Sequence, residues 1–405
     1  MRLTALLLAL PLISGAALAE EDSFRACLDE LRAQALAQGL SDHAVDRAFA
    51  GIQRRPRVLE LDASQPEFQR TFWQYLQARV TQARVEQGRR LLQAHGPLLW
   101  RVHREFGVRP EYLLAFWGLE TNYGGYMGGM GVLDALATLA CDTRRADFFR
   151  NELLQALRIV QSGDVALELM RGSWAGAMGH KQFMPSTYNA YALDYDGDGR
   201  RDLWGSLPDA FASAANYLSA EGWRDGERWG REVRLPRDFD WSLARLDENR
   251  PLDEWRALGV RRANGAPLPP GDMQAALLLP QGHRGPSFLV YQNFHVIMRW
   301  NRSSHYALAV GHLADRIAGM GELRAAPLNE APLRRGQVLE IQRGLNALGL
   351  GAGEPDGIVG PQTRQAVRAF QQIGGYPADG HADQSLLRRL RESLEQGPDP
   401  AGGST

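Results

Sequence analysis

Glu120 is the residue whose type and surroundings most strongly indicate catalysis. It ends a predicted helix that opens near Pro110 and is apolar at most positions up to Leu119, and the glycine-dense segment 124–129 follows it. A carboxyl group held against an aromatic wall beneath an open loop has its charged form disfavoured by desolvation, which suits a general acid. A solvated glutamate at a helix end is the alternative, and the helix by itself does not decide between the two.

The elements that must position Glu120 are predicted to be mainly helical. Apolar residues recur at helical spacing through residues 24–171, for example at Phe149, Leu153, Leu157 and Val160. Residues 172–209 are rich in Gly, Asp and aromatic residues and indicate loops, where binding and catalytic residues are common. Short extended runs within about 222–294 predict a small β-containing insertion, and helical spacing resumes over 295–317.

Three short segments resemble one enzyme family. Residues 118–124 read Gly-Leu-Glu-Thr-Asn-Tyr-Gly and resemble the Glu-Thr/Ser-x-x-Gly signature of lytic transglycosylases. Residues 172–179 (Gly-Ser-Trp-Ala-Gly-Ala-Met-Gly) and 182–186 (Gln-Phe-Met-Pro-Ser) resemble the membrane-bound lytic transglycosylase B type, family 3. The resemblance covers most of residues 24–317. It implies a mainly α (α+β) fold, with a goose-lysozyme-like helical catalytic core and the β-containing insertion.

The resemblance also implies a reaction. Members of this family cleave the β-1,4 bond between N-acetylmuramic acid and N-acetylglucosamine in peptidoglycan without hydrolysis. Ordinary glycosidases use two carboxylates, and the three segments contain no second acid besides Glu120. The resemblance implies that Glu120 acts first as acid and then as base, while the muramic O6 hydroxyl attacks C1 and leaves a 1,6-anhydro end, with no cofactor for catalysis. A hydrolytic muramidase and a catalytically silent wall-binding scaffold are the alternatives.

The resemblance assigns substrate contacts to Arg144, Arg145, Ser173, Gln182, Tyr217 and Asn301, and the ring of Tyr123 is a candidate platform for a sugar. The resemblance implies that Ser173 binds the O6 hydroxyl and that the two arginines suit a stem-peptide or lactyl carboxylate. Structural hydrogen bonding, capping or core packing are the alternatives at these positions. Trp300 stands where the family has a tyrosine. Lys181, the only lysine, is expected to face solvent.

A cluster of carboxylates predicts a cation site. Five residues match positions 1, 3, 5, 6 and 9 of an EF-hand-like loop, and Arg200 would supply a main-chain carbonyl at position 7: Asp194, Asp196, Asp198, Gly199 and Asp202. Position 12 is Gly205, but the family has an enlarged loop that is closed by a later aspartate, and Asp209 fits that place. We expect structural Ca²⁺ here, because such a density of carboxylates is costly without a cation. A plain Asp-Gly turn is the alternative.

Residues 335–391 form a separate unit by their pattern. Asp356-Gly357-Ile358-Val359-Gly360-Pro361-Gln362-Thr363 precedes a helix that contains Ala369-Phe370-Gln371, and a second turn at 378–380 leads into a further helix. This resembles the three-helix peptidoglycan-binding module of cell-wall hydrolases, and an accidental helical hairpin is the alternative. The implied partners are peptidoglycan glycan strands, with cell-wall synthases or amidases as candidate protein partners.

The N-terminus and the charge balance predict where the protein acts. Arg2, an apolar run to Ile13 and Ala17-Leu18-Ala19 form a signal-peptide pattern, which predicts export to the periplasm as a soluble protein without a membrane anchor. With 46 basic and 47 acidic residues, no net field attracts nucleic acid. In an oxidising compartment Cys27 and Cys141 could pair, and two buried free thiols are the alternative.

The predicted organisation follows from these patterns. It consists of a signal peptide at 1–19, a catalytic region at 20–318 that includes the β-containing insertion, a linker at 319–334, a peptidoglycan-binding domain at 335–392 and a disordered tail at 393–405.

Overall fold

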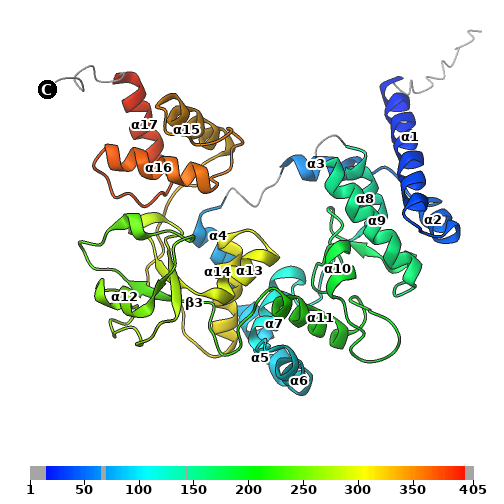
Figure 1. The fold of residues 1–405 in the computed structure, drawn as a ribbon, viewed down its shortest axis with the longest axis horizontal. Helices are drawn as coiled ribbons and strands as arrows, with labels where there is room; N and C mark the ends of the chain where they lie inside the picture. Colours follow the sequence, from blue (N-terminus) through cyan, green and yellow to red (C-terminus); the bar gives the residue numbers. More distant parts are fainter. Residues whose placement is uncertain (1–14, 65–69, 143–144, 397–405) are drawn as a thin grey trace, which may run out of the picture. The chain divides into compact units, whose positions relative to one another are not determined.

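The computed structural model describes residues 15–64, 70–142 and 145–396 of the chain (Figure 1). The chain divides into two units, of which unit 1 comprises residues 1–64 and 124–214, and unit 2 comprises residues 65–123 and 215–405. Helices dominate both units, and the only sheet with more than two strands in the described part of the chain lies in unit 2. The prediction of a mainly helical fold with a small β part is therefore confirmed.

Unit 1 is built around two helices that pack on each other, α8 and α9. Its elements are α1 (Gly15–Ala37), α2 (Asp42–Phe49), α3 (Pro56–Ser64), β1 (Met130–Gly131), α8 (Val132–Ala140), α9 (Ala146–Ser162), η2 (Leu167–Leu169), β2 (Arg171–Gly172) and α10 (Pro185–Tyr191). The apolar face predicted for α9 is buried: Phe149, Leu153, Leu157 and Val160 are all at most 4% exposed. Helix α11 (Leu207–Ala220) begins in unit 1 and ends in unit 2.

A disulfide joins Cys27 of α1 to Cys141 at the end of α8, across 114 residues of sequence. Helix α1 begins at Gly15 and thus continues across the predicted signal-peptidase site, while residues 1–14 of the predicted signal peptide lie outside the described residues. No described helix combines the length and the apolar character that a membrane span requires.

Unit 2 contains a helical part, a sheet and a C-terminal helical module. Its elements are α4 (Phe72–Arg79), α5 (Gln82–Ala94), α6 (Gly96–Phe106), α7 (Pro110–Thr121), β3 (Gly230–Arg234), η3 (Trp241–Leu243), β4 (Arg250–Pro251), α12 (Leu252–Ala257), β5 (Arg261–Arg262), β6 (Gln274–Leu278), η4 (Gly282–Arg284), β7 (Ser287–Val290), α13 (Gln292–Trp300), α14 (Ser304–Ile317), α15 (Arg335–Ala347), α16 (Pro361–Ile373) and α17 (Gln384–Gln396). Helix α7 packs on α14, α5 and α6.

The five-stranded sheet lies where the sequence predicts the β-containing insertion. Its strand order is β4-β6-β7-β3-β5, with antiparallel pairing throughout, and the register pairs Gly230 with Val290 and Leu277 with Leu289. The short extended runs that the sequence predicts in this region include β6 and β7. An apolar cluster that includes Trp255, Leu277 and Leu289 packs the sheet against α12.

The C-terminal module repeats one local arrangement. In the first copy Gln342 donates to the carboxylate of Asp356 and accepts from the amide of Gly357. In the second copy Gln371 donates to Asp379 and accepts from the amide of Gly380. Gly357 and Gly380 have φ of 79° and 71°, a conformation that glycine adopts without strain. The second predicted turn, at 378–380, therefore has the same pattern of hydrogen bonds as the first.

Helix α17 is longer than the sequence predicts. It continues to Gln396, so residues 393–396 are helical, in contrast to the predicted tail. Residues 397–405 of that tail lie outside the described residues. Leu386, Leu387 and Leu390 of α17 are buried against α15 and α16, and this apolar face stabilises the helix up to its last turn.

The module is attached to the sheet region by side chains as well as by the chain. Asp379 accepts hydrogen bonds from the amide and the ring Nδ1 of His283, at 2.8 and 2.7 Å. Glu330, in the predicted linker, contacts His381 of the module and Gln281 of the sheet region. Burial opposes ionisation of Asp379, but hydrogen bonds from His381 and His283 hold its pKa below the usual value. The segment 319–334 is thus held in place by polar contacts of its own.

Candidate functional site

Glu120 lies in the last turn of α7, and every other residue of that helix is buried. Its own side chain is partly exposed. The helix ends directly after it, because Asn122 adopts a left-handed conformation with φ of 50° and its amide donates to the carbonyl of Trp117. The fold therefore presents one carboxylate at the end of a helix that is otherwise part of the core.

Two neutral donors converge on one oxygen of this carboxylate. Trp300 Nε1 donates to Glu120 Oε1 at 3.0 Å, and the hydroxyl of Tyr306 donates to the same atom. Burial and the neighbouring charge of Glu120 raise the pKa of Tyr306 well above its ordinary value, so this hydroxyl stays protonated and remains a donor. These two donors orient the carboxylate through Oε1.

Aromatic rings form the wall beside the carboxylate that the sequence predicts. Phe116, one helical turn before Glu120, lies 4.5 Å from Trp300 between ring centroids. Tyr217, a predicted substrate contact, packs edge-on against Trp300 at 5.2 Å. Because Trp300 replaces the tyrosine expected from the family, its indole N–H supplies a donor at a position where a hydroxyl was expected.

The other predicted residues of unit 2 occupy different environments. Asn301 is the C-cap of α13, directly after Trp300, and its side chain is partly exposed. Tyr123 is 7% exposed, its hydroxyl donates to the carbonyl of Arg84 at 2.8 Å, and its ring packs on Trp117. These contacts favour the packing alternative for Tyr123 over a direct sugar contact.

Substitution of Tyr306 by phenylalanine tests the arrangement around Glu120. A hydrogen bond to a charged group contributes about 1.5–3 kcal/mol, so we expect kcat to fall about ten- to a hundred-fold. The hydroxyl of Tyr306 favours the carboxylate form of Glu120, so its removal favours the protonated form that starts the reaction, and the alkaline limb of the pH–rate profile should move to higher pH. Steady-state kinetics across pH measure both effects.

Tyr112→Phe is the matched control, since Tyr112 is also a buried tyrosine of unit 2 and its hydroxyl accepts from the amide of Trp229, away from Glu120. If Tyr306→Phe changes only KM, or if its pH profile coincides with that of the parent, the positioning role is excluded.

Ser173 and Gln182, in unit 1, lie on the loop that follows β2, and β2 pairs with β1 at the end of the glycine-dense loop 124–129. Ser173 accepts hydrogen bonds from the amides of Ala175 and Ala177, and Gln182 donates to the carbonyls of Met127 and Gly179. These bonds shape the loops, as the structural alternative expects. They orient both side chains, and their predicted role in substrate binding stays a prediction.

Glycine is required where the two loops approach each other. A Cβ on Gly128, which has φ of 97°, would lie 2.0 Å from the carbonyl oxygen of Gly172. The loop that carries Ser173 is closed further by the bridge between Met178 and Phe183. The glycine-dense segments of the sequence therefore serve close backbone packing within unit 1.

Of the two adjacent arginines predicted to bind a carboxylate, the structure describes only the second. Arg144 lies outside the described residues. Arg145 pairs with Asp62, whose side chain is 4% exposed, and its guanidinium lies 5.1 Å from the ring centroid of Phe149. Arg145 therefore has a carboxylate partner inside unit 1.

Lys181 contradicts the expectation that it faces solvent. Its side chain is fully buried, and its ammonium lies 4.5 Å from the ring centroid of Phe211 on α11. A cation over an aromatic face gains electrostatic stabilisation that partly replaces water. The neighbouring sequence could not show this, because the ring that receives the ammonium is on a later helix.

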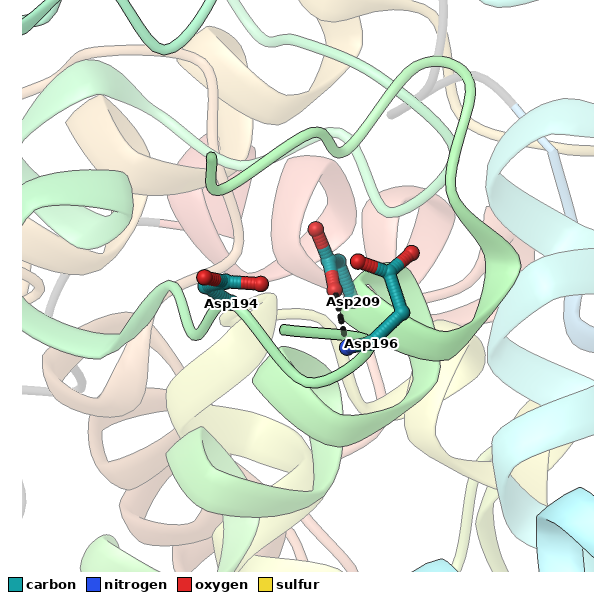
Figure 2. Close-up of side chains that lie close together, drawn as sticks. All are labelled: Asp194, Asp196 and Asp209. Carbon is teal, nitrogen blue, oxygen red and sulfur yellow. Dashed lines mark hydrogen bonds between the residues drawn. The ribbon is translucent and has the colours of Figure 1, made fainter. Parts of the chain in front are cut away.

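Three carboxylates of the predicted ion loop come together. Ligand atoms of Asp194, Asp196 and Asp209 all lie within 4.8 Å of one another, and Figure 2 shows the three side chains with the hydrogen bond from the Asp196 amide to Asp209. Asp209, from the start of α11, is fully buried and also accepts from the amides of Tyr195 and Asp202. Burial raises the pKa of Asp209, although these amides oppose the shift.

The remaining residues of the loop shape its backbone. Asp194 accepts from the amides of Gly197, Asp198 and Gly199, and Gly199 has φ of 87°, which suits the glycine at position 6. Asp198 accepts from the amide of Arg200 and is exposed. The donor set of clustered carboxylates on a tight turn fits a hard divalent cation such as Ca²⁺.

Tyr306, a partner of Glu120, is not among the residues that the sequence predicts for the site. It lies 186 residues further along the chain and begins a helix that looks ordinary by its pattern. Its one local signal is its place shortly after Asn301, at the start of a new helix. That signal indicates a turn between two helices and does not indicate which carboxylate the hydroxyl reaches.

Comparison with known proteins identifies two families along the chain. The family described as transglycosylase SLT domain matches residues 23–315, and the family described as putative peptidoglycan binding domain matches residues 334–390. Among curated proteins, the membrane-bound lytic murein transglycosylase B of Escherichia coli (strain K12) is 34% identical over 245 residues. That match covers 59% of this chain and 65% of the relative, so the chain spans slightly less than two thirds of the relative's length.

Solved structures include close relatives. SltB3 from Pseudomonas aeruginosa, in complex with NAG-anhNAM-pentapeptide, has a TM-score of 0.88 and 52% identity, and the match covers 91% of this chain and 99% of that one. The E. coli lytic transglycosylase Slt35 in complex with calcium has a TM-score of 0.61 and 31% identity, over 72% of this chain and 92% of that one. Both relatives therefore resemble this chain in sequence as well as in fold.

Proposed function

This chain belongs to the transglycosylase SLT domain family, and we propose that it is a lytic transglycosylase that cleaves the β-1,4 bond between N-acetylmuramic acid and N-acetylglucosamine in peptidoglycan. The observation that carries the proposal is the partly exposed Glu120, oriented by Tyr306 and Trp300 at the end of a buried helix within the matched residues. The second matched family, at residues 334–390, supports peptidoglycan as the substrate.

Glu120 performs both proton transfers in the proposed reaction. It first protonates the glycosidic oxygen, and the bond from that oxygen to C1 of the muramic residue breaks. The resulting carboxylate then takes the proton of the O6 hydroxyl, whose oxygen bonds to C1 and closes a 1,6-anhydro ring. Donors from Trp300 and Tyr306 stabilise the carboxylate between the two steps. That SltB3 was solved with NAG-anhNAM-pentapeptide supports an anhydro product.

Ser173, Gln182, Tyr217 and Asn301 are the proposed sugar contacts. Ser173 and Gln182 are pre-oriented by loop hydrogen bonds, and Tyr217 is placed against Trp300.

The C-terminal module, α15–α17, is proposed to hold the enzyme on the glycan strands of the wall, with synthases or amidases as candidate protein partners. Export to the periplasm, as the signal-peptide pattern predicts, would bring the chain to this substrate.

Analysis of the products tests the proposed reaction. Purified sacculi are digested with the protein, and the soluble fragments are examined by mass spectrometry. Ends that are lighter than reducing ends by one water indicate 1,6-anhydromuramic acid, as proposed. Reducing muramic ends would establish the hydrolytic muramidase, and a complete lack of released fragments would establish the scaffold.

We propose that the ion loop holds a structural Ca²⁺ through Asp194, Asp196, Asp198 and Asp209, with the carbonyl of Arg200. The clustered carboxylates of unit 1 support this assignment, as does the calcium complex of Slt35. Bound Ca²⁺ would neutralise the mutual repulsion of these groups. It has no step in the proposed reaction.

Removal of Ca²⁺ with EGTA is expected to lower the Tm. A ligand present at 100 times its Kd stabilises a protein by about 2.7 kcal/mol, so a difference of several degrees is expected. Asp194→Asn should lower the Tm in Ca²⁺ and remove most of its response to the ion, whereas Asp29→Asn, an exposed position on α1, should behave as the parent. Scanning calorimetry with and without Ca²⁺ measures the difference, and an equal response in all three proteins would refute the site.

A further inference from the structure

A cleft of about 650 Å³ opens beside the start of β3 in unit 2. Three arginines line it, Arg224, Arg228 and Arg231, together with Tyr291 at the end of β7 and the acidic residues Glu227 and Asp272. Its volume lies within the range of sites that hold small ligands. None of these residues takes part in the reaction proposed for Glu120.

The three arginines differ in how they are paired. Arg224 lies 3.5 Å from Glu227, and Arg228 lies 3.1 Å from Asp315. Arg231 has no carboxylate at ion-pair distance within the described part of the chain, although its guanidinium carbon lies 5.6 Å from the ring centroid of Tyr291. The cleft therefore contains a half-buried cation whose charge the protein itself leaves unbalanced.

Buried donors in the lining lack acceptors. Nε of Arg228 and Nε of Arg231 are buried without a hydrogen-bond partner among the described residues, and the hydroxyl of Tyr291, which interacts with the Arg231 guanidinium, is buried without an acceptor for its own proton there. Tyr291 is fully buried, and burial raises its pKa, so the hydroxyl remains a donor at neutral pH. Buried polar groups in native proteins are nearly always paired. The unmatched donors of this cleft, which three arginines and two acidic residues line, favour an anionic group of a ligand.

The substrate of the proposed function provides such an acceptor. The glycan strand consists of N-acetylated amino sugars without net charge, and its free carboxylates belong to the stem peptide. The arginine that the sequence assigns to this peptide within the described residues, Arg145, already pairs with Asp62. Guanidinium groups match carboxylates in geometry as well as charge.

We propose that this cleft binds the stem peptide of peptidoglycan, with Arg231 and Arg228 holding one of its carboxylates and the hydroxyl of Tyr291 donating to the same group. Glu227 and Asp272 supply the complementary charge for a peptide ammonium, and Oε1 of Glu227 is itself buried without a partner. The assignment rests on the proposed function only for the identity of the ligand. The cleft and its unmatched donors stand independently of it.

Calorimetric titration of the full-length protein with the free stem pentapeptide L-Ala-γ-D-Glu-meso-diaminopimelate-D-Ala-D-Ala tests the assignment. This probe contains no glycosidic bond, so binding does not depend on catalysis. Arg231→Gln should weaken binding about ten-fold or more, Arg231→Lys should restore part of it, and Tyr291→Phe should weaken it several-fold. Arg234→Gln is the matched control, an exposed arginine on the same strand, and should leave the Kd unchanged.

The results of this titration distinguish a carboxylate-binding site from a solvated cleft. A pentapeptide with amidated carboxylates should bind the parent protein as weakly as the free peptide binds Arg231→Gln. Failure of the parent to bind the pentapeptide, or equal losses in Arg231→Gln and Arg234→Gln, would overturn the assignment and leave a solvated cleft. Sacculi are digested in parallel: if no fragments are released while the pentapeptide binds, the proposed function fails and the peptide site stands.

Discussion

Replacement of Glu120 by glutamine is expected to reduce the release of fragments from sacculi at least about 1,000-fold, with the Tm close to that of the parent. General acid–base catalysis by one positioned group contributes about 10²- to 10⁴-fold, and Glu120 is proposed to act twice in each turnover. Glutamine keeps the shape and accepts the hydrogen bonds of Trp300 and Tyr306 through its amide oxygen. It can neither release nor accept the proton that the reaction requires.

Glu86→Gln provides the matched control for that experiment. Glu86 is an exposed glutamate on α5 of the same unit, and its substitution should leave both turnover and Tm unchanged. The binding of Glu120→Gln to sacculi should persist through the C-terminal module and the proposed sugar contacts. Turnover by Glu120→Gln within ten-fold of the parent would rule out the assigned chemistry, whichever products form.

Removal of the disulfide is expected to have the largest effect on stability. The bond closes a loop of about 114 residues between α1 and the end of α8. For loops of about 100 residues the entropic description gives about 4.7 kcal/mol, and measured losses are typically 2–5 kcal/mol. The double variant Cys27→Ser/Cys141→Ser should therefore unfold at a clearly lower denaturant concentration than the parent.

Reduction provides an internal control for this second prediction. Dithiothreitol should lower the unfolding midpoint of the parent to that of the double variant and should leave the double variant unchanged. A fluorescence probe placed in unit 1 should report the shift, since both cysteines belong to that unit. Coincident midpoints for oxidised parent and double variant would show that the bond contributes nothing to stability.

Features carried by short stretches of sequence could be predicted. The buried face of α9 follows from the spacing of Phe149 and its apolar neighbours, because a helix fixes which side chains share a face. The turns of the C-terminal module follow from Asp356-Gly357 and their later repeat, because glycine permits the left-handed backbone that those turns need. The proximity of Asp194 and Asp196 follows in the same way from their spacing, whereas Asp209 was expected from the family resemblance.

Partner choice between distant residues could not be predicted. Lys181 lies in a segment that resembles a catalytic family, yet its burial depends on Phe211 of a later helix. Arg145 looked available for a substrate carboxylate until the structure placed it on Asp62. For both residues the alternatives were contact with solvent or substrate and pairing inside the protein. Which one occurs depends on the group that packs nearby, because a buried charge needs a partner to offset its desolvation.

The sequence alone determined the family resemblance, Glu120 as the catalytic candidate, the glycine-dense loops and the two-turn C-terminal module. These features depend on residue types at short spacing, which the backbone geometry of helices and turns converts directly into structure. Only the tertiary structure decided that Tyr306 and Trp300 orient Glu120, that Asp379 joins the module to His283, and that Arg231 has no carboxylate partner among the described residues. Those outcomes are set by packing between segments far apart in the chain, where position in sequence carries no information about distance.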